Sequence, residues 1–182
     1  MASGSNQSNM ANRRSDVRQD ECGAYFYQYV SLVNDIELVP ALEQGRDETA
    51  KFFGAIPEDR HEYSYAPGKW TPKDMLLHII DTERIFAYRA LRFTREQDTD
   101  LPGFEQDIFA ASGNANSRTM NDLLDEYTAV RNSNIAMFRS FDDAALVRIG
   151  KASNTNMSPR AVGFIICGHE IHHMAVLRDR YL

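Results

Sequence analysis

The sequence SPRAVGFIICGHEIHHMAVLRDR, residues 158–180, decides the fold. It opens with serine and proline, which are typical of a helix start because serine caps free backbone N–H groups and proline suits the first turn. At 100° per residue, its apolar side chains form a stripe along one side. His169 and His173 lie in the centre of this stripe, one turn apart, and His172 lies at its edge. We therefore expect a helix that points two imidazoles into a protein core.

Two imidazoles at positions i and i+4 of a helix can bind one metal ion at about 2.0–2.1 Å. The alternative is a pair of neutral, hydrogen-bonded core histidines, and the spacing alone leaves both possibilities open. A metal ion needs a third ligand, and His78 is the candidate. It lies on a partly polar inner face of another predicted helix, at a depth that matches the pair if the two helices pack side by side.

Three further long helices are predicted, over 35 or 39 to 56, over 71–95 and over 119–141. The second opens with TPKD, in which threonine caps the helix, proline takes the first position and aspartate completes a capping box. A short helix is expected near 105–111. The aromatic segment 24–33 is ambiguous and can form another short helix.

These patterns predict an all-α fold, most simply an antiparallel four-helix bundle with one or two long connections. Strand signals are weak, and the Gly/Ser/Asn/Thr-rich residues 149–157 are predicted as a loop. Residues 1–22 are almost empty of large apolar groups. Burial cannot offset the ordering entropy of such a segment, so we expect a flexible tail followed by one domain over 23–182.

Composition argues against several functional classes. The formal net charge is −6 and the basic residues form no cluster, so we expect no nucleic-acid partner. The longest core-like apolar stretch, around 162–167, is too short to cross a bilayer, and no apolar segment follows the first basic residues. Cys22 and Cys167 lie far apart and fit a reducing compartment. We therefore expect a cytoplasmic protein that acts without a membrane.

Four residues near the histidines are candidates for supporting contacts or substrate binding: Asp81, Thr82, Arg89 and His172. Asp81 can orient an imidazole N–H, as metal-binding histidines usually require, and Thr82 shares the inner face of its helix with His78. Glu170 follows a candidate ligand directly and can do the same, but its place on the helix favours an exposed acid.

Arg89 lies on the same inner face and has two interpretations. It can hold an anionic group of a substrate. Equally, it can extend to solvent or pair with an acid of the third long helix, such as Asp125 or Glu126.

Three other residues are expected to have structural roles or none. Trp70, just before a helix cap, is expected to be a packing anchor, and Cys167 is expected to be a small buried apolar residue. His61 lies in a predicted loop, where we expect it to be exposed.

Several short motifs occur in a fixed order: YAPGKWTPKD at 65–74, His78, DTER at 81–84, RALR at 89–92, LPGF at 101–104 and GHEIHH at 168–173. This set, which extends from about residue 23 to the end of the chain, resembles the DinB/YfiT-like superfamily. The resemblance implies a four-helix bundle, commonly dimeric, with a divalent metal ion held by three histidines. One comes from the second helix and two from the last, which are His78, His169 and His173 here.

The resemblance also bears on function, because relatives include metal hydrolases and thiol-dependent transferases and isomerases that use bacillithiol, mycothiol or glutathione. Three imidazoles leave open positions on an ion such as Zn²⁺, Ni²⁺ or Fe²⁺, where water, a thiol or a substrate can bind. We expect a thiol-dependent S-transferase that acts on a small electrophile with a low-molecular-weight thiol. The alternatives are a metal-dependent hydrolase and a non-catalytic module for metal binding or dimerisation.

The helix predicted over 158–180 carries a second group of apolar residues opposite its histidines, at Phe164, Ile171 and Met174. A helix on the surface of a protein needs only one apolar stripe. Two stripes predict either a central position in the fold or burial in a homodimer.

Overall fold

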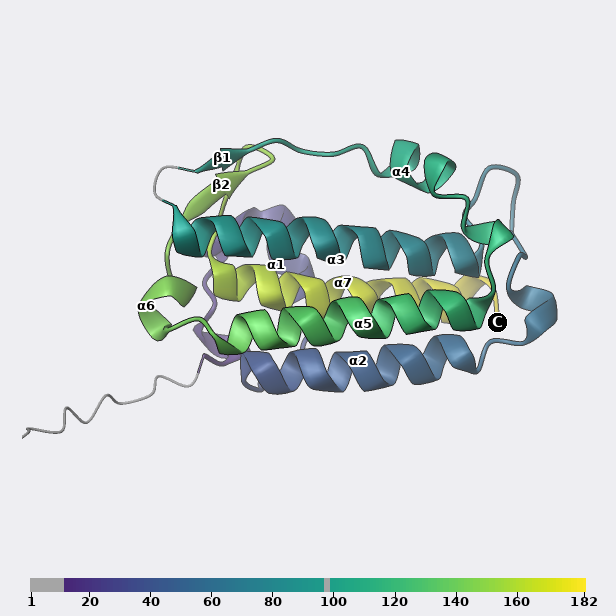
Figure 1. Cartoon of the computed structure of the whole chain (residues 1–182), viewed down its shortest axis with the longest axis horizontal. Helices are drawn as coiled ribbons and strands as arrows, with labels where there is room; N and C mark the ends of the chain where they lie inside the picture. Colours follow the sequence, from purple (N-terminus) through teal and green to yellow (C-terminus); the bar gives the residue numbers. More distant parts are fainter. Residues whose placement is uncertain (1–11, 97–98) are drawn as a thin grey trace, which may run out of the picture.

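The computed structural model describes residues 12–96 and 99–182 (Figure 1). Its long helices are α2 (Leu38–Gly54), α3 (Pro72–Arg95), α5 (Met120–Arg139) and α7 (Pro159–Arg180). Helices α3 and α2 each pack against both α5 and α7, which closes the bundle. The predicted all-α four-helix bundle is therefore confirmed. Among the described residues, none of the helices combines the length and the apolar character that crossing a lipid bilayer requires.

The directions of the helices differ from the simplest antiparallel arrangement. Helices α2 and α7 run one way, and α3 and α5 run the other way (Figure 1). The connection from α3 to α5 contains β1 (Asp100–Leu101) and α4 (Gln106–Gly113), which lead the chain back along α3 to the end where that helix began. As a result α3 and α5 are parallel neighbours, whereas α3 and α7 are antiparallel neighbours.

Local capping explains where the bundle helices begin. The Thr71 hydroxyl accepts a hydrogen bond from the backbone N–H of Asp74 at 3.1 Å, and the Asp74 carboxylate accepts one from the N–H of Thr71 at 2.9 Å. Thr119 and Ser158 cap α5 and α7, each accepting from the N–H three residues further on. These side chains satisfy N–H groups that have no partner inside a helix, so the observed starts lie next to the predicted ones.

Shorter elements complete the chain: α1 (Gly23–Val30), α6 (Asp143–Leu146) and 3-10 turns at Arg14–Asp16, Gln19–Glu21, Glu58–Arg60 and Ala115–Ser117. The aromatic segment that was ambiguous in sequence contains α1, which packs against α7. Helix α4 lies close to the short helix predicted near 105–111.

Residues 149–157 contain a β-hairpin, and the prediction of a loop is wrong. Strand β2 (Gly150–Ala152) pairs antiparallel with β3 (Thr155–Met157), and β1 pairs parallel with β2. The turn residues Ser153 and Asn154 have φ angles of 51° and 59°. Positive φ at both positions is what a two-residue hairpin turn needs, and asparagine tolerates it well. Strands this short carry too little alternation to be recognised in sequence.

The flexible tail predicted for residues 1–22 does not hold for its second half. Residues 1–11 lie outside the described part of the chain. Residues 12–22 are tied to the bundle, because the buried Glu21 carboxylate accepts hydrogen bonds from Arg160 at 2.6 and 2.8 Å and from the Ser158 hydroxyl at 2.7 Å. These partners lie at the start of α7, so the segment anchors that helix.

Helix α7 is buried along most of its length because it lies between the other bundle helices and α1. Phe164 and Met174 of its second apolar side are buried within this one chain. A Cβ atom at Gly168 would lie 1.9 Å from the backbone oxygen of Tyr29, so only glycine allows α1 to approach this closely. The central position explains the two apolar sides, and the homodimer stays a prediction.

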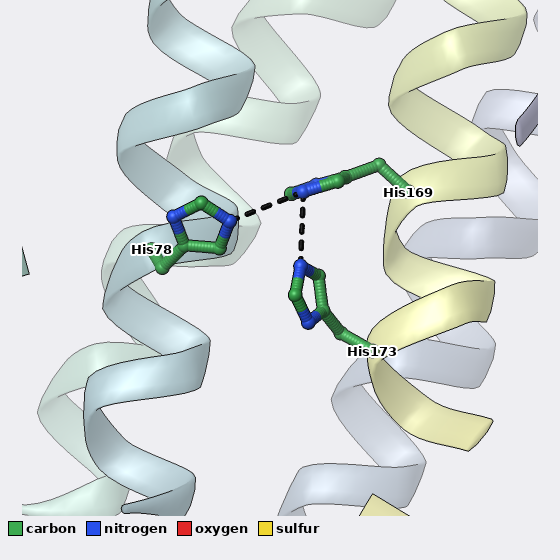
Figure 2. A group of neighbouring side chains, drawn as sticks. All are labelled: His78, His169 and His173. Atoms are coloured by element: carbon green, nitrogen blue, oxygen red, sulfur yellow. Dashed lines mark hydrogen bonds between the residues drawn. The ribbon is translucent and has the colours of Figure 1, made fainter. Parts of the chain in front are cut away.

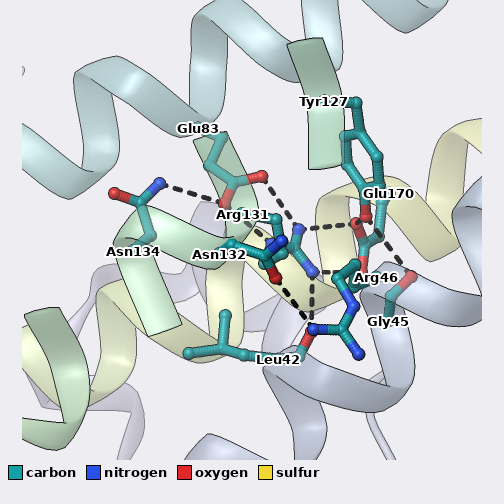
Figure 3. A network of polar contacts seen from close by, with 9 residues as sticks. All are labelled: Leu42, Gly45, Arg46, Glu83, Tyr127, Arg131, Asn132, Asn134 and Glu170. Atoms are coloured by element: carbon teal, nitrogen blue, oxygen red, sulfur yellow. Dashed lines mark hydrogen bonds and ion pairs between the residues drawn. The ribbon is translucent and has the colours of Figure 1, made fainter. Parts of the chain in front are cut away.

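A fully buried ion-pair network joins the four bundle helices (Figure 3). Arg131 of α5 donates to Glu83 of α3 at 2.7 and 2.9 Å, to Glu170 of α7 at 2.7 and 3.2 Å, and to the backbone oxygen of Leu42 in α2 at 3.0 Å. These five bonds use all five N–H donors of the guanidinium. Glu170 is thus a buried partner of Arg131, and the expectation of an exposed acid is wrong.

The network also fixes how closely the helices approach. A Cβ atom at Gly45 of α2 would lie 2.0 Å from Glu170 Oε1, so glycine is needed there. The Tyr127 hydroxyl donates to Glu170 at 2.8 Å, which satisfies a further lone pair of that carboxylate. Burial alone would lower the pKa of Arg131, but the carboxylates of Glu170 and Glu83 raise it well above its ordinary value. The central arginine therefore stays charged at any ordinary pH.

We expect Arg131→Ala to lower the free energy of unfolding by about 3–5 kcal/mol, because it leaves two buried carboxylates without their cation. Arg139→Ala is the matched control on the same helix, since Arg139 forms an exposed ion pair with Glu43. Urea unfolding measures both. A loss for Arg131→Ala no larger than that of the control would contradict a stabilising role of the network.

The buried ion pair of Glu21 with Arg160 predicts how the free energy of unfolding depends on pH. Burial raises the pKa of its carboxyl group, but hydrogen bonds from Arg160 and Ser158 outweigh burial and leave the pKa below the ordinary value of 4.5. A carboxyl group whose pKa is depressed by folding stabilises the protein above the unfolded-state pKa, and this contribution is lost as the pH falls through the folded-state value.

The stability advantage of the wild type over Glu21→Gln should therefore be constant between about pH 7 and pH 5.5 and shrink as the pH falls to about 3. Chemical unfolding of both proteins at a series of pH values measures it. An advantage that stays the same down to pH 3 would contradict the assignment of the ion pair to this carboxylate.

Candidate metal centre

Three histidine side chains meet between α3 and α7 (Figure 2). His78 extends from α3, while His169 and His173 extend from α7 one turn apart. The Nε2 atom of His169 lies 3.1 Å from that of His78 and 3.0 Å from that of His173. The three ligand atoms all lie within 4.8 Å of one another. The structure thus brings together the three histidines that the sequence singled out.

The geometry of these nitrogen atoms does not suit ordinary hydrogen bonding. A neutral imidazole carries either one hydrogen or one lone pair on Nε2. His169 Nε2 faces two other Nε2 atoms at hydrogen-bonding distance, so it cannot make a full hydrogen bond with both. Three lone pairs that converge on one point repel each other unless a cation lies among them.

Two of the three separations match those expected around one ion. Nitrogen ligands at about 2.0–2.1 Å from a metal lie about 2.8–3.0 Å apart at octahedral angles and about 3.3–3.4 Å apart at tetrahedral angles. The two short separations, 3.0 and 3.1 Å, lie within these limits. The residues therefore fit a divalent ion held by three imidazoles, which leaves at least one position for another ligand.

The electrostatics keep the imidazoles in the form that binds metal. Burial lowers the pKa of His78 to about 4, against the opposing charge of Asp107, and it lowers the pKa of His173 to about 3. Burial, together with the charges of the neighbouring histidines, lowers the pKa of His169 well below its ordinary value. All three are therefore neutral at pH 7, with no proton to displace before a metal ion binds.

The groups around the three histidines hold them in place. The Thr82 hydroxyl lies 3.4 Å from His78 Nδ1, as expected for a residue one turn further along α3. The Trp70 ring packs against the His78 ring with 4.7 Å between centroids, and Tyr29 of α1 meets the His169 ring edge-on at 5.6 Å. His173 Nδ1 is buried and has no hydrogen-bond partner among the described residues.

Two of the other candidates lie apart from this group. Asp81 forms an ion pair with Arg84 at 3.6 Å and is not among the groups that contact the imidazoles. His172 is exposed and packs on Tyr29 and His173 through its ring, without adding a nitrogen to the cluster. The structure therefore favours Thr82 over Asp81 as the residue that orients His78.

A cavity of about 290 Å³ opens beside the histidines. His78 and His169 form part of its wall. Aromatic side chains make up much of the rest: Tyr25, Phe26, Tyr29, Phe86 and Phe104. This is the lower end of the usual size of ligand pockets, so the cavity suits a small molecule.

Arg89 also lines this cavity and is only 2% exposed. Its Nη2 donates to the backbone oxygen of Pro102 at 3.2 Å and to the Ser153 hydroxyl at 2.8 Å. The alternative is wrong in both its forms, because the side chain does not reach solvent and forms no ion pair with Asp125 or Glu126, of which Glu126 pairs with Arg84 and Arg118. The guanidinium thus faces the cavity.

Sequence reasoning missed several groups at the site. Tyr29 lies in the segment whose structure was ambiguous, and Ser153 lies in the hairpin predicted as a loop. The Ser-Asn pair at 153–154 was the one signal for that turn.

Cys167 agrees with its interpretation as a small buried apolar residue, since it is buried and burial raises the pKa of its thiol. His61 is half-buried, with Nε2 3.0 Å from the backbone oxygen of Ile56.

The fold of this chain is similar to that of a known protein. A solved structure is similar over 78% of this chain and 82% of its own, with a TM-score of 0.70 and 13% sequence identity. It is YfiT from Bacillus subtilis, described as a probable metal-dependent hydrolase with an unusual four-helix bundle topology. At this identity the likeness shows the fold alone.

A search of curated proteins found no match. A family model, described as the DinB superfamily, matches residues 41–177. This range covers most of the chain and includes all three histidines of the cluster. The chain therefore belongs to the DinB superfamily.

Proposed function

We propose that this protein is a metal-dependent enzyme in which His78, His169 and His173 hold one divalent ion next to a small-molecule cavity. The observation that carries the proposal is the convergence of three neutral Nε2 atoms beside that cavity. A structural zinc site is usually closed by four protein ligands, whereas three ligands leave a position for a reacting group. The imidazole set suits Zn²⁺, Ni²⁺ or Fe²⁺ without choosing among them.

An ion bound there lowers the pKa of an adjacent water or thiol and so supplies a nucleophile near neutral pH. In this proposal the surrounding residues bind and orient the substrate, and two carboxylates line the cavity. Glu83, which lines the cavity, already accepts hydrogen bonds from Arg131 and Asn134. Glu105, the other carboxylate at the cavity, is exposed at the start of α4.

Thiol transfer is the reaction we favour. A second, more open cavity of about 730 Å³ is lined by Trp70, whose ring contacts His78, and we assign the thiol to it although none of the three histidines lines it. In the reaction the thiolate sulfur attacks an electrophilic carbon, an S–C bond forms, and the bond to the leaving group breaks. The leaving group takes the electron pair, and the thiol proton goes to solvent.

Hydrolysis is the second candidate. It needs one organic substrate and water, and the cavity beside the histidines suffices for it. The description of YfiT as a probable metal-dependent hydrolase supports this reading by analogy of fold.

We expect wild-type protein reconstituted with Zn²⁺ to retain about one ion per chain after gel filtration, and each of His78→Ala, His169→Ala and His173→Ala to lose it, since two imidazoles cannot replace three. His172→Ala is the matched control, because this neighbour of His173 lies outside the cluster. Elemental analysis measures the ion. Loss of metal in His172→Ala with retention in His173→Ala would overturn the ligand assignment.

The metal-loaded protein should consume a small electrophile such as 1-chloro-2,4-dinitrobenzene only when bacillithiol, glutathione or coenzyme A is added. His78→Ala should reduce the rate at least about a thousandfold, because Lewis-acid activation contributes several kcal/mol to the transition state. His61→Ala, which changes a histidine outside the site, is the control. Turnover of an ester such as 4-nitrophenyl acetate without thiol would favour hydrolysis, and no turnover at full metal occupancy would favour a binding module.

A further inference from the structure

Three arginines are buried among the described residues, and two of them are fully neutralised. Arg131 binds two carboxylates, and Arg160 binds Glu21. The buried Lys73 likewise pairs with Glu62. Arg89 differs, because no carboxylate of residues 12–96 or 99–182 lies within ion-pair distance of it. A buried charge without a partner is costly, so its place calls for an explanation.

The unpaired guanidinium is held in one orientation. It lies over the Phe86 ring, with 4.8 Å from its central carbon to the ring centroid. Only Nη2 makes hydrogen bonds within the described chain, to Pro102 and Ser153. Nε and Nη1 therefore keep donors for another acceptor. Nη1 lies on the other side of the guanidinium from the Nε–H, so the two do not form a fork, and a carboxylate oxygen can accept a charge-assisted hydrogen bond from one of them.

Arg89 and the histidines line the same cavity from one helix. Eleven residues separate His78 from Arg89, which is about 16 Å along the axis of α3. Helix side chains lean toward the N-terminus, and the longer arginine extends further in that direction than His78 does, which shortens the distance between the two groups. Aromatic rings line the cavity along with these two groups. The cavity thus offers a cation, an apolar wall and the histidine cluster.

From this arrangement we infer that Arg89, together with Ser153, is the anion-binding end of the substrate site, and that the ligand is a small elongated organic carboxylate. Its reacting end lies at the histidines and its apolar middle against the rings. The carboxylate supplies the negative charge that the described chain does not provide for Arg89, whereas Glu83 and Glu170 provide it for Arg131. The placement of the reacting end rests on the proposed function, whereas the anion site does not.

The test compares ligands that differ only in charge, with the zinc-loaded full chain. The probes are 6-mercaptohexanoate and 6-mercaptohexan-1-ol, and binding is followed by calorimetry and by the fluorescence of Trp70, which contacts His78. We expect the wild type to bind the carboxylate at least about tenfold more tightly than the alcohol, in the range of one charge-assisted hydrogen bond. Equal affinities would overturn the inference.

Variants locate the source of this preference. Arg89→Gln should reduce it to about twofold or less, because the carboxylate loses far more affinity than the alcohol does. Arg92→Gln is the matched control on the same helix, because Arg92 is bonded to Tyr88 and Glu96 instead. A preference that survives Arg89→Gln would overturn the inference. A purely structural role of Arg89 would not change the ratio of the two affinities.

A second comparison needs no variant, in case Arg89→Gln does not fold. 4-Mercaptobutanoate and 4-mercaptobutan-1-ol have the same two heads on a chain two carbons shorter, which falls short of Arg89 and is too long to chelate the zinc ion through both heads. The preference for the carboxylate should be absent in this pair, and the same preference in both pairs would show attraction to the metal alone and overturn the inference.

Hexanoate and hexan-1-ol, which carry no thiol, separate the two proposals. If the protein binds no metal, the thiol probes will not bind. Tighter binding of hexanoate than of hexan-1-ol, lost in Arg89→Gln, would then still support the anion site. Equal affinities for hexanoate and hexan-1-ol would overturn the inference.

Discussion

Arg131 carries a positive charge into the centre of the bundle, and the other three long helices are placed so that their polar groups meet it (Figure 3). The ion pair also sets the rotation of α7. Successive residues of a helix point about 100° apart, so turning Glu170 toward Arg131 turns His169 away from the bundle centre and toward α3. Glu83, which binds the same guanidinium, orients α3 in turn. The histidines of α3 and α7 can meet because Arg131 binds Glu83 and Glu170 and so fixes the orientation of these two helices.

The consecutive residues Gly168, His169 and Glu170 show that α7 must make specific contacts on several sides at once. Gly168 lies against the backbone of α1, His169 faces His78 of α3, and Glu170 faces Arg131. Three consecutive residues thus meet three different neighbours, which is possible only for a helix surrounded by others. This is why α7 lacks the single apolar side of a surface helix, and why a change at any of the three would disturb the histidine cluster.

What could be predicted from the sequence depended on local rules. Helix starts follow from caps that span three residues, and the histidine pair follows from a spacing of one turn. The ion pairs could not be predicted, because Glu170 and Arg131 are 39 residues apart and Arg160 and Glu21 are 139 apart. A helical wheel gives the direction of Glu170 relative to the histidines, but it cannot show that Arg131 lies on that side, so it favoured an exposed acid where the structure has a buried one. The same limitation concealed the ordered segment 12–22.

The buried polar groups divide according to whether the chain itself satisfies them. Arg131 uses every donor on carboxylates and a carbonyl of its own chain, so nothing is left for a ligand. Arg89 and the histidine cluster keep bonding capacity that the described chain does not fill, and both border one cavity. Because leaving such groups unfilled costs stability, their joint presence on a single wall is best explained by molecules that bind there. Helix α3 separates the two roles, with Glu83 bonded to Arg131 and His78 and Arg89 at the cavity.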